Sequence, residues 1–297
     1  MKMKFRAHES FFIRKGWLYK GLKNVNRKAD VFTDNKTQNP MDTLGIGANM
    51  VKSLRYWLQA VGLTVEPTSG IRSQTFTELG QIIWDHDRYL EEMGTLWLFH
   101  YILATNKDSA TAWYYFFNEF RFSTEFNKDD FVTAIGSWVK MNGEEFADTS
   151  YEGDFDCIMN TYVSRAKSNP SKVHPESNID CPFGELGLVD IMSKKDKSFR
   201  KCTPKKDTLH PIIVLAVIIA NMPEGEHEVR ISVLQSDICN IGKIFNLDSV
   251  ALTDYLYQIA ALGYIKVVRT AGLDVVRIET NMNFLECVNE YYEKINQ

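Results

Sequence analysis

Apolar residues recur at helical spacing in the segment 41–62, MDTLGIGANMVKSLRYWLQAVG. At 100° per residue, positions 49–61 divide into an apolar stripe and an opposite polar face. The stripe consists of Met50, Leu54, Trp57, Leu58 and Val61. The polar face consists of Asn49, Lys52, Arg55, Tyr56 and Gln59. Because cations and amides bind phosphates and base edges in the major groove, the pattern predicts a DNA-facing helix. A helix whose polar face is only solvated is the alternative.

Apolar and polar positions alternate after this helix. The residues 63–67 (LTVEP), a polar turn at 68–74 and the residues 75–79 (TFTEL) are typical of a short β-hairpin. Helix, turn, helix and hairpin is the order of a winged-helix module. We therefore expect residues 1–80 to form an N-terminal winged-helix-like domain that binds DNA.

The residues 13–28 (IRKGWLYKGLKNVNRK) predict a basic helix that Gly16 and Gly21 interrupt. The cations that we expect to contact DNA there are Arg14, Lys15, Lys20, Lys23 and Arg27. Residues 1–60 hold 12 Lys and Arg against 4 Asp and Glu, whereas residues 61–163 hold 6 against 17. A basic end on an acidic body favours oriented binding of double-stranded DNA at that end. Docking of the basic end on the acidic part of the chain is the alternative.

The residues 81–168 follow long helical patterns that are rich in aromatic residues. Ser109 and Asn127 are predicted to cap two of these helices. Base-stacking platforms combine aromatic rings with cations, and this region is acidic, so we interpret the aromatic residues as the core of a helical bundle. The residues 169–208 contain many turn-forming and basic residues, and we expect a basic linker there.

The residues 209–297 repeat the winged-helix order. Pro211 begins a predicted helix, the residues 232–241 form a second, and Asp248 caps a third, which an alternating hairpin at 264–280 follows. The outward face of the third helix carries no cation, so we interpret this C-terminal winged-helix-like domain as a scaffold or a protein-docking module. The predicted fold is mainly α, with winged-helix modules at the N- and C-terminal ends flanking a helical bundle.

Composition excludes several classes of protein. The chain has 297 residues, of which 44% are hydrophobic and 24% charged, as in ordinary globular proteins. The longest apolar run, at 212–220, is too short to span a membrane, and the N-terminus is too polar for a signal peptide. We therefore expect a cytoplasmic protein without a membrane partner. The 5 cysteines are widely spaced and include no CxxC pair, which predicts free thiols.

Strong enzyme motifs are absent: the sequence has no nucleophile elbow, P-loop, dinucleotide fingerprint or HExxH. Two carboxylate clusters are candidates for holding Mg²⁺ or Mn²⁺ during phosphodiester cleavage, namely Asp85 with Asp87 and Asp154 with Asp156. Acids at a helix N-terminus or in a capped loop are the structural alternative for both clusters. The sequence alone selects neither as a catalytic or metal site, and no motif requires a cofactor.

Four segments carry a family resemblance: FFIRKGWLYKGL, MDTLGIGANMVKSLRYWLQAVGL, GTLWLFHYILATN and AWYYFFNEF. They resemble an uncharacterised bacterial family that is encoded beside the sulfur-transfer enzymes of DNA phosphorothioation. The resemblance implies a role like that of the SspB component of the Ssp system, a DNA-nicking partner of the other subunits of the phosphorothioation machinery. No catalytic motif carries over residue by residue, so nicking rests on the resemblance alone.

Three functions are therefore open. The first is a DNA-binding subunit, with or without nicking activity, of a bacterial phosphorothioate modification and phage-defence system. The second is a winged-helix transcription regulator, and the third is a non-enzymatic adaptor. A plasmid-nicking assay with magnesium or manganese separates the first from the others. The sequence does not decide between a monomer and a homo-oligomer, nor which DNA sequence is recognised.

Overall fold

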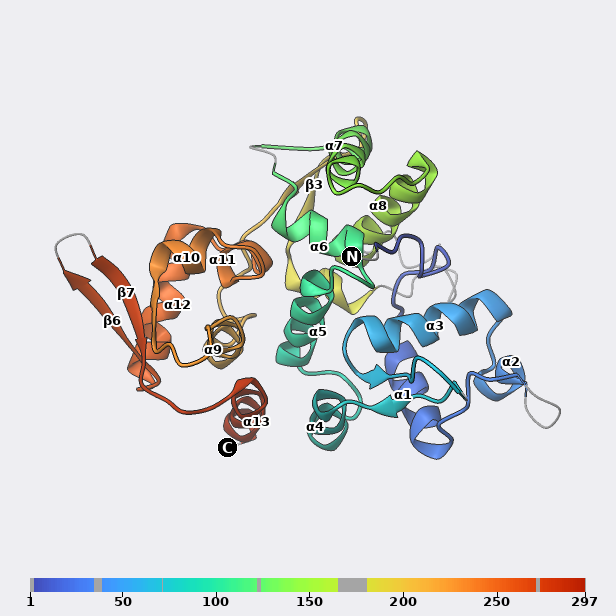
Figure 1. Ribbon diagram of the computed structural model, residues 1–297, viewed down its shortest axis with the longest axis horizontal. Coiled ribbons are helices and arrows are strands. Elements are labelled where there is room, and N and C mark those ends of the chain that lie inside the picture. The colour runs from blue at the N-terminus through green and yellow to red at the C-terminus, as the bar shows by residue number, and fades with distance from the viewer. Residues whose placement is uncertain are drawn as a thin grey trace, which may run out of the picture.

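The computed structural model describes residues 3–34, 39–70, 72–121, 124–164, 181–270 and 273–296. Within these ranges the chain is mainly α, as predicted, with three small antiparallel sheets. Figure 1 shows an N-terminal group of elements (α1 to β2) on the right, a middle group (α4 to β4), and a C-terminal group (α9 to α13) on the left. The helices are α1 (Trp17–Arg27), α2 (Pro40–Leu44), α3 (Ala48–Ala60), α4 (Glu78–His86), α5 (Met93–Thr105), α6 (Thr111–Asn118), α7 (Lys128–Met141), α8 (Asp148–Tyr162), the 3-10 helix η2 (Pro182–Leu186), α9 (Pro211–Ala220), α10 (Ile231–Ser236), α11 (Ile241–Ile244), α12 (Ser249–Ala261) and α13 (Phe284–Ile295). The strands are β1 (Thr64–Val65), β2 (Thr75–Phe76), β3 (Val189–Ser193), β4 (Ser198–Lys201), β5 (Glu228–Arg230), β6 (Ile265–Thr270) and β7 (Leu273–Ile278).

Helices α1 and α3 pack against each other in the N-terminal group. A Cβ atom on Gly21 in α1 would come within 2.7 Å of the Leu58 Cδ1 atom in α3, so glycine allows the two helices to approach closely. The predicted apolar stripe of α3 is buried except for Met50, which is half-buried. The predicted hairpin is also confirmed, because β1 and β2 pair antiparallel.

The middle group contains the aromatic core that the sequence predicts. Nearly all of α5 and all of α6 are buried. The largest fully buried aromatic residues of this group include Trp97, Phe99, Trp113, Phe116, Phe117, Phe131, Phe155 and Tyr162. Asn127 caps α7 in a capping box with Asp130, as expected. The expected cap at Ser109 is wrong, because α6 follows Ala110 and no side chain caps it.

A buried histidine joins the middle and C-terminal groups. The His100 Nε2 atom in α5 lies 2.7 Å from the carbonyl oxygen of Ile244 in α11, and its Nδ1 atom lies 2.8 Å from the hydroxyl of Tyr162 in α8. A carbonyl only accepts, so Nε2 donates and Nδ1 accepts from the hydroxyl. Burial lowers the pKa of His100 to about 4, which keeps the ring neutral at pH 7.

The residues 181–208 are not the linker that we expected. They form η2 and an antiparallel hairpin of β3 and β4. The hairpin is fixed to the middle group, because Phe199 shares two backbone hydrogen bonds with Phe126 and the Lys201 ammonium donates to the carbonyl oxygens of Phe116 and Phe120. Lysine donors at the C-terminal end of a helix satisfy its last carbonyls. The rest of the predicted linker, 169–180, lies outside the described residues.

The C-terminal group confirms much of its predicted order. Asp248 caps α12 by accepting hydrogen bonds from Val250 and Ala251, and β6 and β7 form the predicted antiparallel hairpin. The strand β5, which the sequence pattern did not predict, adds to β7 and makes a three-stranded sheet in the order β5-β7-β6. The predicted helix at 232–241 is shorter than expected: α10 ends at Ser236, where Asp237 is extended, and α11 begins at Ile241 after Cys239, which has a positive φ of 64°.

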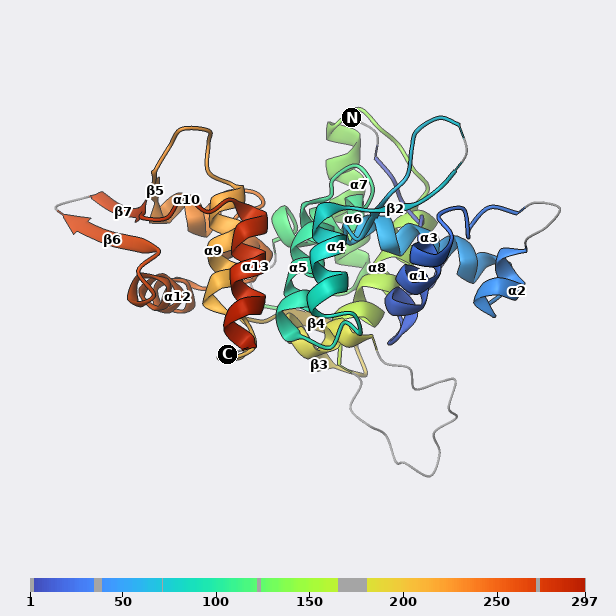
Figure 2. The same ribbon diagram turned by 90° about the horizontal axis from the view of Figure 1, so that it is seen from below.

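The last helix, α13, returns to the middle of the molecule and lies beside α9, α4 and α5 (Figure 2). The hydroxyl of Tyr291 accepts a hydrogen bond from the Gly94 amide, and the hydroxyl of Tyr292 lies 2.6 Å from that of Thr95. These contacts connect the end of the chain to the start of α5. None of the described helices has the length and apolar composition that crossing a membrane requires.

Candidate functional site

Of the five cations that we expected to contact DNA in the first basic segment, three are exposed and two are half-buried. Lys15, Lys23 and Arg27 are exposed, and no ion pair links them to another described residue, although the Lys23 ammonium lies 5.7 Å from the centroid of the Tyr19 ring. Lys20 instead donates a hydrogen bond to the Leu44 carbonyl, and the Arg14 guanidinium lies over the rings of two aromatic residues. We refer to Lys15, Lys23 and Arg27 as the N-terminal cations.

The predicted outward face of α3 is smaller than the sequence pattern indicates. Asn49 and Lys52 are exposed, as expected. Arg55 forms a two-pronged ion pair with Glu66, which lies just after β1, and Gln59 donates a hydrogen bond to the Arg55 carbonyl. Tyr56 is not on an outward face: it is 8% exposed, and its hydroxyl donates to the Ser109 carbonyl. The hairpin and the turn before α6 cover this side of the helix.

Asp154, one of the candidate catalytic carboxylates, is buried and anchors the N-terminal segment. Its Oδ1 atom accepts from the Arg6 amide at 2.9 Å and lies 2.6 Å from the His8 Nε2 atom. The side chain of Asp154 is 2% exposed. Burial raises the pKa of this carboxyl above its usual range, and the hydrogen bond from His8 opposes that effect. The arrangement fits a structural contact between two segments that are distant in sequence.

The pair Asp85 and Asp87 also has structural contacts. Asp85 is exposed and accepts a hydrogen bond from the Gln81 side chain. The two carboxylate oxygens of Asp87 accept from the amides of Glu91 and Glu92 and from the hydroxyl of Thr95, so they cap the turn that leads into α5. Across the described ranges, no group of three or more His, Cys, Asp or Glu side chains is arranged to hold a metal ion.

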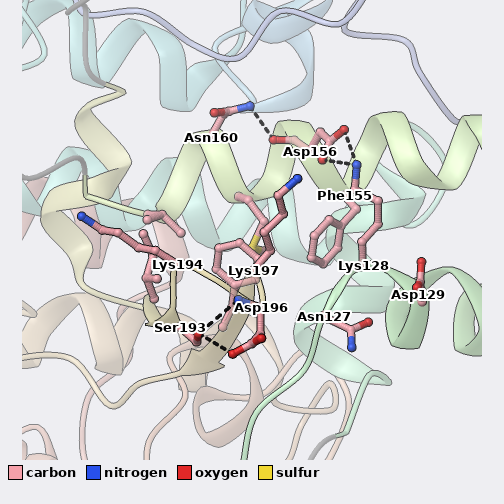
Figure 3. A pocket seen from close by; sticks show the side chains of 14 residues that line it. Asn127, Lys128, Asp129, Phe155, Asp156, Asn160, Ser193, Lys194, Asp196 and Lys197 are labelled. Carbon is pink, nitrogen blue, oxygen red and sulfur yellow. Dashed lines mark hydrogen bonds and ion pairs between the residues drawn. The ribbon is translucent and has the colours of Figure 1, made fainter.

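Asp156, the fourth candidate carboxylate, lies on the rim of a cavity of about 700 Å³. The cavity is formed by the N-terminal end of α7, by α8, and by the hairpin of β3 and β4 (Figure 3). Its apolar lining includes Phe155, Met159, Ile191 and Phe199. Its charged lining consists of Lys128, Asp129, Asp156, Lys194, Asp196 and Lys197. We call this cavity the hairpin pocket.

Within the hairpin pocket, several charges already have partners. The Lys128 ammonium lies 2.7 Å from the Asp156 carboxylate, and the Ser193 hydroxyl donates to Asp196. Lys194 and Lys197 are exposed and form no ion pair with another described residue. The sequence pattern did not predict this pocket, and we expected its lysines to lie in a linker. The signal was the run SKKDKSFRK, in which a turn between short alternating segments indicates a hairpin.

Comparison with solved structures finds the same fold in SspB. The chain aligns with an SspB crystal structure with a TM-score of 0.84 and with a magnesium ion-bound SspB crystal structure with a TM-score of 0.83. Each alignment covers 99% of this chain and 89% of the other, at 24% sequence identity. The expected resemblance to SspB is thereby confirmed at the level of the fold. No curated protein matches the sequence.

Comparison with protein families gives one assignment. The family described as "Protein of unknown function (DUF4007)" matches residues 5–292. The match includes α1, the aromatic core of the middle group and most of α13. Because it spans nearly the whole sequence, the chain belongs to the DUF4007 family.

Proposed function

We propose that this protein is a DNA-binding subunit of an Ssp-type modification and phage-defence system, with a role like that of SspB. The observation that carries the proposal is the near-complete alignment with SspB, which extends over 99% of the chain. A similarity confined to one module would support a shared fold element only. Here the N-terminal, middle and C-terminal groups all have counterparts, which favours a related role in a related assembly of subunits.

The distribution of charge supports DNA as the ligand of the N-terminal end. Lys23 and Arg27 are four residues apart in α1 and therefore project from the same side of that helix. Together with Lys15 they give the N-terminal domain three exposed cations without an ion pair to another described residue, while Asn49 and Lys52 of α3 are also exposed and Lys52 lies 4.0 Å from the Glu9 carboxylate. Unpaired surface cations bind phosphates by releasing condensed counterions, so they contribute affinity without sequence preference.

The division into domains is part of this proposal. Residues 1–80 act as the N-terminal winged-helix-like DNA-binding domain, residues 81–168 as the helical core, and residues 209–297 as a C-terminal winged-helix-like domain. The outward side of α12 carries Tyr257 and Gln258, and its Asp254 is paired with Lys206. A helix without free cations is poorly suited to phosphate, so this second module contacts other subunits of the system.

One of the aligned SspB structures is magnesium ion-bound. The described residues do not fit a metal centre built from protein side chains: they include no group of three acids, histidines or cysteines arranged for one. The Asp87 and Asp154 carboxylates are occupied by hydrogen bonds from backbone and side chains. We therefore derive no cleavage step through a metal, and nicking is left to the assay below.

The test of DNA binding is a charge-matched comparison. We expect the triple variant Lys15→Ala, Lys23→Ala, Arg27→Ala to bind a 30-base-pair duplex more weakly in fluorescence anisotropy. If the three cations each contact a phosphate, the slope of log affinity against log salt should fall in magnitude by about 3. The control replaces three exposed lysines elsewhere, Lys140, Lys195 and Lys205, by alanine and should keep the wild-type slope. Equal slopes for both variants would refute the assignment of the N-terminal cations.

A second assay separates the enzyme from the regulator and the adaptor. Supercoiled plasmid is incubated with the wild-type protein and magnesium or manganese, and then again with EDTA. Metal-dependent relaxation to the open circle adds nicking to the proposed function. Tight duplex binding without relaxation limits the protein to DNA binding. An absence of both binding and relaxation contradicts the proposal and favours the non-enzymatic adaptor.

A further inference from the structure

We propose that the hairpin pocket binds a nucleotide, with its base against the aromatic floor and its phosphate at the two lysines of the hairpin turn. The inference goes beyond the proposed function, since it concerns α7, α8 and the β3–β4 hairpin rather than the N-terminal cations. The volume of about 700 Å³ lies within the range of small-molecule sites and accommodates a mononucleotide. A free nucleotide and one unit of a single strand share this chemistry.

The floor of the pocket is suited to a planar ring. Phe199 is half-buried and contacts Phe155 at 5.8 Å between ring centroids, with the two rings close to perpendicular. Met159 and Ile191 complete the apolar lining. Phe155 is 2% exposed and packs against Phe199, so Phe199 is the ring that is available for stacking. Stacking on an aromatic ring is tolerant of base identity, because every base has a π-face.

The phosphate position follows from the ion pairs that are already formed. Lys128 is engaged with Asp156, whereas Lys194 and Lys197 have no ion-pair partner among the described residues. Both lysines belong to the turn between β3 and β4, where the Ser193 hydroxyl donates to Asp196 and accepts from its amide. Both lysines line the pocket, and Figure 3 shows the Lys197 ammonium directed toward α8 and the Lys194 ammonium directed away from it. Flexible lysine side chains without an ion-pair partner can turn toward an anionic group and bind it.

The opposite edge of the pocket carries polar groups that suit the edge of a base. Asp129 is exposed near the N-terminal end of α7, and Asn160 lies on α8 with its side-chain amide bonded to the Asp156 carbonyl. Carboxylates accept hydrogen bonds from exocyclic amino groups, and amides bond to base edges in both directions. On α7 and α8 the lining carries Asp129 and Asp156 against Lys128, and on the hairpin it carries Lys194 and Lys197 against Asp196. The hairpin side is therefore the more positive one, which orients the phosphate toward the hairpin and the base toward α7 and α8.

Aromatic rings and cations come together here beside an open cavity, whereas the Lys107 and Lys201 ammonium groups lie over rings of the buried core. Most aromatic residues of the region are fully buried in the core, and the surrounding charge is acidic. At the hairpin pocket, the partly exposed Phe199 lies in the same hairpin as Lys194 and Lys197, which have no ion-pair partner among the described residues. This combination of a stacking ring and cations is the one that single-strand binding sites use.

The test uses four kinds of ligand: the four nucleoside 5′-monophosphates, inorganic phosphate, a 12-nucleotide single strand, and the matching duplex. We expect isothermal titration calorimetry to detect binding of a monophosphate or of the single strand. Lys194→Ala with Lys197→Ala should weaken that binding at least about tenfold, since both charge-assisted contacts are lost. Lys195 lies in the same turn but does not line the pocket, so Lys195→Ala with Lys205→Ala is the charge-matched control and should leave binding unchanged.

Phe199→Leu is a second variant that separates stacking from charge. It keeps an apolar residue against Phe126 and Phe155 but removes the ring, so it should weaken nucleotide binding about fivefold or more without abolishing inorganic phosphate binding. Tighter binding of the 12-nucleotide strand than of any monophosphate assigns the pocket to a nucleic-acid strand. Binding of a monophosphate alone assigns it to a free nucleotide.

Two results would overturn the inference. One is the absence of binding by every monophosphate and by the single strand. The other is binding that the Lys194→Ala, Lys197→Ala variant retains at wild-type strength. Failure here is distinguishable from failure of the proposed function, because duplex binding is tested with the N-terminal cations. The Lys15→Ala, Lys23→Ala, Arg27→Ala variant should keep its monophosphate binding whatever happens to its duplex binding.

Discussion

The contact between α13 and α5 makes a specific prediction about Gly94. A Cβ atom at this position would overlap the ring of Tyr291, which is buried and accepts a hydrogen bond from the Gly94 amide at 3.1 Å. In the Gly94→Ala variant, the tyrosine must therefore move and α13 must shift from α5. We expect this single methyl group to destabilise the protein, even though alanine is the better helix former.

The expected magnitude is the sum of three contributions. Overpacking of a buried contact costs about 1 to 3 kcal/mol. Loss of the hydrogen bond between the amide and the Tyr291 hydroxyl adds about 0.5 to 1.5 kcal/mol. The greater helix propensity of alanine returns about 0.5 to 1 kcal/mol. The free energy of unfolding should therefore fall by about 0.5 to 4 kcal/mol.

Urea denaturation at pH 7 measures this change, and two further variants isolate its cause. In Gly136→Ala the new Cβ atom lies 3.6 Å from the nearest atom, in Tyr151, so this helix-interior control should be stabilised. In a Tyr291→Ala background, Gly94→Ala should cost nothing, because the overlapping ring is gone. Additive effects of the two substitutions would refute the reasoning, as would a Gly94→Ala variant as stable as the wild type.

Three further predictions follow from buried side chains. Trp57 is fully buried and its indole donates a hydrogen bond to the Phe11 carbonyl. Trp57→Ala should therefore lower the free energy of unfolding, measured in urea, by about 3 to 5 kcal/mol. A loss under about 1 kcal/mol would contradict this packing. Asp87→Asn should lower the free energy of unfolding by about 1 to 3 kcal/mol, because the Asp87 oxygens accept three hydrogen bonds. Asp85→Asn should leave it unchanged in the same assay. Equal effects of the two substitutions would argue against the capping role of Asp87. The pKa of His100 is lowered from 6.5 to about 4, so the folded state binds fewer protons than the unfolded state between these pH values. The free energy of unfolding should therefore be unaffected by this histidine above pH 6.5 and should fall as the pH decreases from 6.5 to about 4. The same titrations on His100→Gln should show a shallower decrease, and an unchanged pH dependence would rule out this histidine as its source.

Local patterns explain the elements that the sequence predicted correctly. The stripe of α3, the Asn127 capping box and the Asp248 cap depend on residues within about one or two helical turns, so spacing along the chain is enough to identify them. The hairpin of β6 and β7 likewise depends on alternation around one turn. These elements account for the predicted mainly α character and for the helix-then-hairpin order at both ends of the chain.

The candidate sites required contacts that no local pattern contains. Whether Tyr56 faces solvent depends on the turn before α6, which covers it from 53 residues away. Whether Asp154 is available depends on the N-terminal segment, because His8 lies 146 residues earlier in the chain. Tyr56 fits its predicted face by spacing alone, and Asp154 fits its predicted carboxylate cluster, but the burial of each is set by the distant segment that packs on it.

The hairpin pocket and the position of α13 were likewise decided only by the tertiary structure. The pocket combines α7 and α8 with a hairpin that the sequence presented as a basic linker. The contact of Tyr292 with Thr95 joins residues 197 positions apart. The sequence by itself determined which segments become helices and where charge concentrates, because those properties are local. Which charges remain free to bind a ligand was decided by packing, because each buried polar group must find its partner wherever the fold brings one.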